Sequence, residues 1–154
     1  AVSFRYVPVL LGGVFKAIGN QSPMQAYGHI GAKVAYDRLE MQRFMTRHAI
    51  TGFVMNPHFP VNTLLMMRGA IAAERLGCAE AYNAAMFKGM WEQGLKLDLP
   101  DVWERALQDA GLPAADLAAL VSDAEVEAAR AAAHGDGGWS VDQALRHPRA
   151  QFRR

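Results

Sequence analysis

The chain has 154 residues, of which 51% are hydrophobic and 20% are charged. It is therefore long enough to bury a sizeable core, and too apolar to be a disordered segment. Sixteen Lys and Arg against fifteen Asp and Glu leave a formal charge of +1, which argues against nucleic acid or an anionic membrane as the main partner.

The first predicted element is a β-strand at residues 2–9, where apolar and polar side chains alternate with a period of two. Gly12 and Gly13 are expected to end it. A single strand cannot pair its own backbone groups, so this strand would expose an edge and need a partner strand from elsewhere. Residues 19–31 are rich in Gly and Pro and predict a loop with at most a short turn of helix.

Helical spacing begins at Lys33. Four side chains fall on one face of a predicted helix: Met41, Phe44, Met45 and His48. This helix is expected to end near His48. A loop over residues 51–60 is expected to follow.

Further helices are predicted beyond this loop. Their markers are Leu64, Met67 and Ile71 before Gly77; Tyr82, Met86 and Met90; Val102, Trp103, Ala106 and Leu107 before Gly111; and Leu117, Leu120 and Val121 after Pro113. Asp98 is expected to cap the third of these, with Pro100 in its first turn. A capping-box pattern from Ser122 to Glu125 predicts an alanine-rich helix to about Ala133. We expect a mostly α-helical chain with one strand and five or six helices.

Cys78 is the single cysteine, so no intrachain disulfide can form, and we expect a cytoplasmic protein. The thiol follows Gly77 and is expected to be half-buried and inert. The short apolar segment Val7–Phe15 lacks a basic leader and does not predict a signal peptide, and no run is long enough to span a membrane. The five histidines have neither i, i+4 spacing nor companion cysteines, so no metal site is expected.

Two short segments carry candidate binding chemistry. Lys16, Asn20 and Lys33 could bind an anionic, peptide-like ligand, because ammonium groups neutralise carboxylates and an amide both donates and accepts. Spacing alone favours the plainer alternative, in which Asn20 lies in a turn and both lysines are solvated.

The second segment runs from Asn56 to Thr63, and its prolines hold the backbone between them. Asn62 most simply caps the following helix. His58 could carry a proton near neutral pH, or pack against Phe59. The methionines and Trp91 and Trp103 of the helices are most simply core residues, although methionine and tryptophan also suit a pocket for a flat aromatic molecule.

The run Val7–Pro23 and the segment Asn56–Thr63 resemble the kappa-class glutathione transferases and the 2-hydroxychromene-2-carboxylate isomerases, and the resemblance extends to about Arg130. These enzymes have a DsbA-like thioredoxin α/β fold with a large helical insertion. The resemblance implies one domain over residues 1–154. In it, residues 1–10 would be a strand remnant of the thioredoxin core, residues 33–133 the helical region and residues 134–154 a divergent tail.

By this resemblance, Asn20 and Lys33, with Lys16, would bind glutathione as a cofactor. His58, Pro60 and Asn62 would border the cleft for the aromatic substrate. The family's Ser-Pro-Tyr segment, whose serine favours the glutathione thiolate, and its Val-Pro-Thr segment are absent from the sequence, so no catalytic residue is assigned.

Two functions follow as expectations. The first is a glutathione-dependent isomerase that acts on aromatic 2-oxo acids or their cyclic hemiketals. The second is a non-catalytic truncated helical domain, which pairs its exposed strand in a homodimer or larger oligomer. A disulfide oxidoreductase is disfavoured because Cys78 has no partner cysteine.

Overall fold

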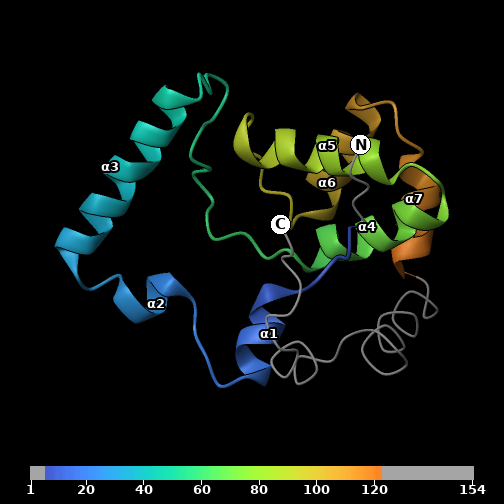
Figure 1. Cartoon of the computed structure of the whole chain (residues 1–154). Coiled ribbons are helices and arrows are strands. Elements are labelled where there is room, and N and C mark those ends of the chain that lie inside the picture. Colours follow the sequence, from blue (N-terminus) through green and yellow to red (C-terminus); the bar gives the residue numbers. More distant parts are fainter. Residues whose placement is uncertain (1–5, 123–154) are drawn as a thin grey trace, which may run out of the picture.

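The computed structural model describes residues 6–122, and this part of the chain contains seven helices and no strand (Figure 1). The helices are α1 (Leu11–Ala17), α2 (Pro23–Tyr27), α3 (Gly31–Arg47), α4 (Leu64–Arg75), α5 (Ala79–Trp91), α6 (Pro100–Asp109) and α7 (Ala114–Ser122). None of the helices within these residues is both long and apolar enough to span a bilayer. The expectation of a mostly α-helical chain is confirmed for the described part.

The core lies among α4, α5, α6 and α7, which make the extensive helix–helix contacts of the described residues. Its largest fully buried side chains are Trp103, Tyr82, Leu97, Leu107 and Leu117. Each such side chain contributes on the order of 2 kcal/mol when it is removed from water. Apart from Leu64 and Ile71, the predicted apolar markers of these four helices therefore form one core.

Two of the four helices end as their glycines predict. Gly77 and Gly111 have φ angles of +69° and +68°, a left-handed conformation that glycine adopts without steric cost. After α4, Gly77 N–H donates to the Glu74 carbonyl and Cys78 N–H donates to the Ala73 carbonyl, the paired bonds of a Schellman motif. The same pair of bonds recurs after α6.

The start of α6 differs from the prediction. Pro100 occupies the first turn as expected, but the N-cap residue is Leu99, which provides no side-chain cap. The carboxylate of Asp98 instead lies 3.1 Å from the ammonium of Lys96. The expected cap at Asp98 is therefore wrong, because a nearby cation binds the carboxylate.

The prediction of an N-terminal strand is also wrong for the residues that the structure describes. Residues 6–10 belong to no strand, and Gly12 and Gly13 lie inside α1 rather than ending a strand. Val14 N–H donates to the Leu10 carbonyl. No partner strand exists among the described residues, and the chain becomes helical only from Leu11 onward, where backbone groups pair within α1. Residues 1–5 lie outside the described part.

The short turn expected within residues 19–31 is present as α2. It begins with a capping box that the prediction did not include: Gln25 N–H donates to Ser22 Oγ, and Ser22 N–H donates to Gln25 Oε1. The alanine-rich helix expected up to Ala133 and the tail at 134–154 lie outside the described residues.

We call residues 6–50, with α1, α2 and α3, the N-terminal arm, and residues 51–122 the bundle. No residue of α1, α2 or α3 is buried, and Figure 1 shows α3 standing apart from α4–α7. The predicted apolar face of α3 exists, but Met41 and Phe44 are 40% and 58% exposed. The periodicity predicted the helix correctly, and no other part of residues 6–122 buries the apolar face of α3.

Candidate functional site

The described residues form a cleft of about 170 Å³ between α4 and α5, which we call the methionine cleft. Methionines and aromatic rings supply most of its wall, and Thr63 and Asn83 are its polar members beside the Tyr82 hydroxyl. The methionines and aromatic residues are Met66, Met67, Met86, Met90, Tyr82, Phe87 and Trp91. Spacings of three and four residues along each helix place these side chains on one face.

The wall chemistry suits a small, flat, apolar ligand. Thioether sulfur is polarisable and contacts aromatic rings favourably, and methionine side chains adapt to ligand shape. Phe87 is 66% exposed at this cleft, so a ligand would cover an aromatic surface that is otherwise in water. A hydroxyl and an amide, from Thr63 and Asn83, are available to orient a polar group on such a ligand.

Tyr82 forms part of the wall and is not an acid or base for catalysis. Its hydroxyl donates to the Met66 carbonyl and accepts a hydrogen bond from Trp103 Nε1, both at 2.9 Å. Burial raises the pKa of Tyr82 far above its usual range, and the hydrogen bond from Trp103 acts weakly in the opposite direction. The phenol therefore stays neutral and ties α4, α5 and α6 together.

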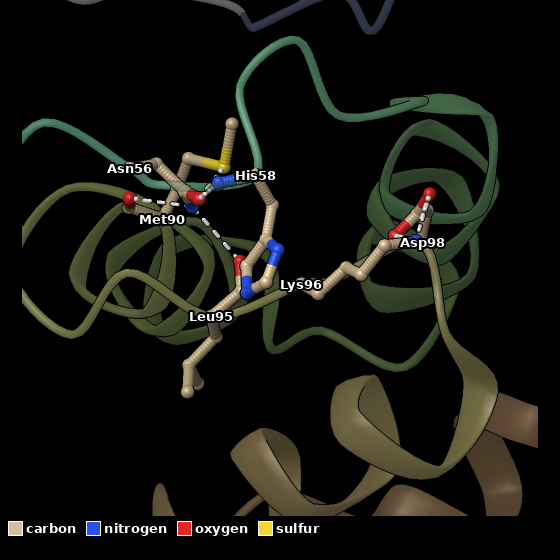
Figure 2. A network of polar contacts seen from close by, with 6 residues as sticks. All are labelled: Asn56, His58, Met90, Leu95, Lys96 and Asp98. Carbon is tan, nitrogen blue, oxygen red and sulfur yellow. Dashed lines mark hydrogen bonds and ion pairs between the residues drawn. The ribbon is translucent and has the colours of Figure 1, made fainter.

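The loop before α4 is fixed to the end of α5 by Asn56, which is only 3% exposed (Figure 2). Its Nδ2 donates to the carbonyls of Met90 and Leu95 at 3.0 and 2.9 Å, and its Oδ1 accepts from His58 N–H at 2.8 Å. All bonding groups of the amide are thus in use. Sequence reasoning missed this role, since a single asparagine in a loop gives no signal of burial.

Two aromatic side chains of the same loop flank Trp91. Phe53 stacks on the indole with ring centroids 5.7 Å apart, and Phe59 lies 5.9 Å from it at a tilt. Val54 N–H donates to the Trp91 carbonyl at 2.6 Å. Trp91 therefore connects the loop to the methionine cleft and remains partly exposed.

All six predicted site residues are exposed, and none lines the methionine cleft. Lys16 lies on α1, and Asn20 follows that helix and accepts a hydrogen bond from Gln21 N–H at 2.8 Å. Lys33 lies in the first turn of α3, with its Nζ 5.3 Å from the centre of the Tyr27 ring.

The three predicted cleft residues lie on the loop beside Trp91. Asn62 Oδ1 accepts from Leu64 N–H at 3.0 Å, at the first residue of α4. The N-cap itself is Thr63, without a side-chain cap, so Asn62 binds the first N–H of the helix from one residue before the cap position. The backbone of His58 binds Asn56, while Phe59 packs on Trp91. Pro60 follows Phe59 through a cis peptide bond.

Cys78 is half-buried, as expected, at the N-cap of α5 and packs against the core, while the inertness of its thiol stays a prediction. Within residues 6–122, no group of three or more His, Cys, Asp or Glu side chains could hold a metal ion.

Comparison with known proteins gives one result. The family described as the DSBA-like thioredoxin domain matches residues 1–136. No curated protein and no solved structure shows a significant match to the chain. Since the match covers most of the sequence, the chain belongs to the DSBA-like thioredoxin domain family.

Proposed function

We propose that the chain is a glutathione-dependent isomerase of the 2-hydroxychromene-2-carboxylate isomerase type, acting on aromatic 2-oxo acids or their cyclic hemiketals. The observation that carries this proposal is the methionine cleft, whose apolar wall and few polar groups suit an aromatic ring with an oxygen substituent. Membership of the DSBA-like family and the narrower resemblance of Val7–Pro23 and Asn56–Thr63 support it.

In this proposal the chain has two binding tasks. The methionine cleft takes the aromatic ring, and Asn83 and Thr63 orient its oxygen substituents. Lys16, Asn20 and Lys33 bind glutathione, because exposed ammonium groups and an amide suit a tripeptide with two carboxylates. Bound glutathione would supply a thiol that adds reversibly to a conjugated double bond.

The test measures thermal unfolding with two probes, millimolar glutathione and millimolar phenylpyruvate. Glutathione should raise the midpoint in the wild type and not in Asn20→Ala, because a ligand that binds only the folded state stabilises that state. Phenylpyruvate should raise it in the wild type and not in Ala70→Phe, which fills the methionine cleft.

Ala84→Phe is the matched control for the second probe, since Ala84 is exposed on α5 and does not line the cleft. It should respond to phenylpyruvate like the wild type. A wild-type midpoint that neither probe moves would reject the proposal.

A second candidate is a non-catalytic helical domain that works through an interaction surface. The observation that favours it is the N-terminal arm, whose apolar side chains are exposed. The described residues provide no strand for pairing, so the interaction would use helices. Cooperative unfolding that neither glutathione nor phenylpyruvate affects would favour this candidate.

A further inference from the structure

The N-terminal arm carries most of the uncovered apolar surface of the described chain. Of the nineteen exposed large hydrophobic side chains, thirteen lie in residues 6–50. Four of them, on α3 alone, are Tyr36, Leu39, Met41 and Phe44, with exposures of 40–58%. Scattered exposed apolar residues are normal, but a concentration of this kind on one segment indicates a surface that another surface covers.

The arm and the bundle carry opposite charge, which the net charge of the whole chain conceals. Residues 6–50 contain five Lys and Arg against two Asp and Glu, a formal charge of +3. Residues 51–122 contain five against eight, a formal charge of −3. Complementary charge of this size steers two surfaces together and disfavours contact between like surfaces. The arm should therefore prefer a bundle to another arm.

The bundle of the same chain does not receive the arm. The extensive helix contacts of the described residues involve α4–α7 only, and α1, α2 and α3 bury nothing. The hydrogen bonds of Asn56 and of Val54 N–H fix the chain to the end of α5, and this anchored loop is where the arm departs. The complementary surface is then available to a second copy.

A receiving surface is present on α5. Phe87 is the most exposed hydrophobic side chain of the bundle, at 66%, and it lies at the mouth of the methionine cleft. Glu80 and Glu92, near the two ends of α5, are exposed. Although Lys88 beside Phe87 is also exposed, the two glutamates leave α5 and its C-cap with a net negative charge. This face suits α3, where four basic side chains outnumber two acidic ones, Arg43 is ion-paired with Glu40, and Arg47 accompanies Phe44.

We propose that the chain forms a two-fold dimer by reciprocal docking, in which the arm of each copy covers the α5 face of the other. Since each copy supplies one arm and one bundle, both contacts form at once and the assembly closes at two chains. The proposal rests on exposure and charge and does not depend on glutathione binding.

The test uses charge reversal on the full chain and measures mass in solution by light scattering. The wild type should have twice the mass of the chain. The arm variant Arg43→Glu/Arg47→Glu and the bundle variant Glu80→Lys/Glu92→Lys should each weaken the dimer by about tenfold or more, because each places like charges together. An equimolar mixture of the two variants should recover the dimer, since opposite charges then meet at both contacts.

Asp109→Lys/Asp116→Lys is the matched control. These exposed acids lie on α6 and α7 and do not line the methionine cleft, so this variant should remain dimeric. Circular dichroism confirms that each variant is folded before its mass is interpreted.

A wild type that stays monomeric at every concentration overturns the proposal. So does a dimer that survives both charge reversals, or a mixture of folded variants that stays monomeric. A monomeric wild type would imply that another protein covers the arm. Either of the other two results would imply that the copies meet through a different contact. Mass is independent of ligand response, so this test and that of the isomerase function can fail separately.

Discussion

Asn56 and Tyr82 are the two polar side chains on which the bundle depends most. Each lies in apolar surroundings, and each has its polar atoms in hydrogen bonds to other parts of the chain. A buried polar group with its partners in place specifies one arrangement, whereas the same group without partners is costly. Both residues therefore position the cleft and leave no free donor for a ligand.

Replacing Asn56 by Ala should destabilise the fold by about 3 kcal/mol, because the carbonyls of Met90 and Leu95 and the N–H of His58 lose their partner at a buried position. Urea unfolding measures this loss. Asn20→Ala, which removes an exposed asparagine, should change stability by no more than about 0.5 kcal/mol. Equal effects of the two substitutions would contradict the anchoring role of Asn56.

Tyr82 should make stability fall in alkaline solution. In the unfolded chain its phenol loses a proton near the ordinary pKa of about 10, whereas burial raises the pKa in the folded chain and the proton stays. Above that pH the unfolded state binds fewer protons, so the free energy of unfolding falls by up to about 1.4 kcal/mol per pH unit.

Urea unfolding between about pH 8 and about pH 11 measures this slope, because the ordinary tyrosine pKa lies inside that window. Tyr82→Phe should be less stable than the wild type at neutral pH, yet lose less stability per pH unit above about pH 10. Parallel pH profiles for the two proteins would show that Tyr82 is not the titrating group.

At the scale of helices, the local sequence was enough to predict some helix ends, but not the features that depend on distant parts of the chain. Gly77 and Gly111 ended helices as predicted, because a left-handed residue after a helix is a local requirement. Gly12 and Gly13 were misinterpreted as the end of a strand, since the absence of a partner strand is not a local property. Asn56 was missed for a related reason: its partners lie 34 and 39 residues away.

The close approach of α4 to α5 and α6 depends on Gly69. A Cβ atom at this position would collide with the Tyr82 hydroxyl and lie 2.8 Å from Cζ2 of Trp103. Neither ring can move, since both are fully buried. Gly69→Ala should therefore cost about 1–3 kcal/mol in urea unfolding.

Gly12→Ala provides the contrast for Gly69→Ala. Gly12 also lies in a helix, but a Cβ atom there would have nothing within 4 Å. Alanine should be neutral or should favour α1 by up to about 1 kcal/mol. If both alanines were tolerated alike, α4 would not be held as close to α5 and α6 as the structure has it.

At the scale of the whole molecule, the described residues form two parts with different physical character, a packed acidic bundle and an uncovered basic arm. The proposed glutathione residues Lys16, Asn20 and Lys33 belong to the arm, and the methionine cleft belongs to the bundle. Within one chain, none of these three lines the cleft. Reciprocal docking would bring the arm of one copy to the cleft of another, so the two proposals together predict a composite site that forms only in the dimer.

Limited trypsin digestion should detect this docking without any substitution. In dilute solution the first cuts should fall in α3 at Arg38, Arg43 and Arg47, because these arginines are exposed on a helix that no core supports. When the protein concentration is raised about a hundredfold at fixed trypsin activity, dimer formation should slow these cuts by about tenfold or more, since docking must reverse before cleavage.

Arg105 in α6 should be cut slowly throughout, as it is part of the bundle. The growth of the fragments specific to each cut in early mass spectra, normalised to a casein standard digested alongside, gives both rates. Rates of α3 cleavage that do not change with protein concentration would show that the arm stays uncovered.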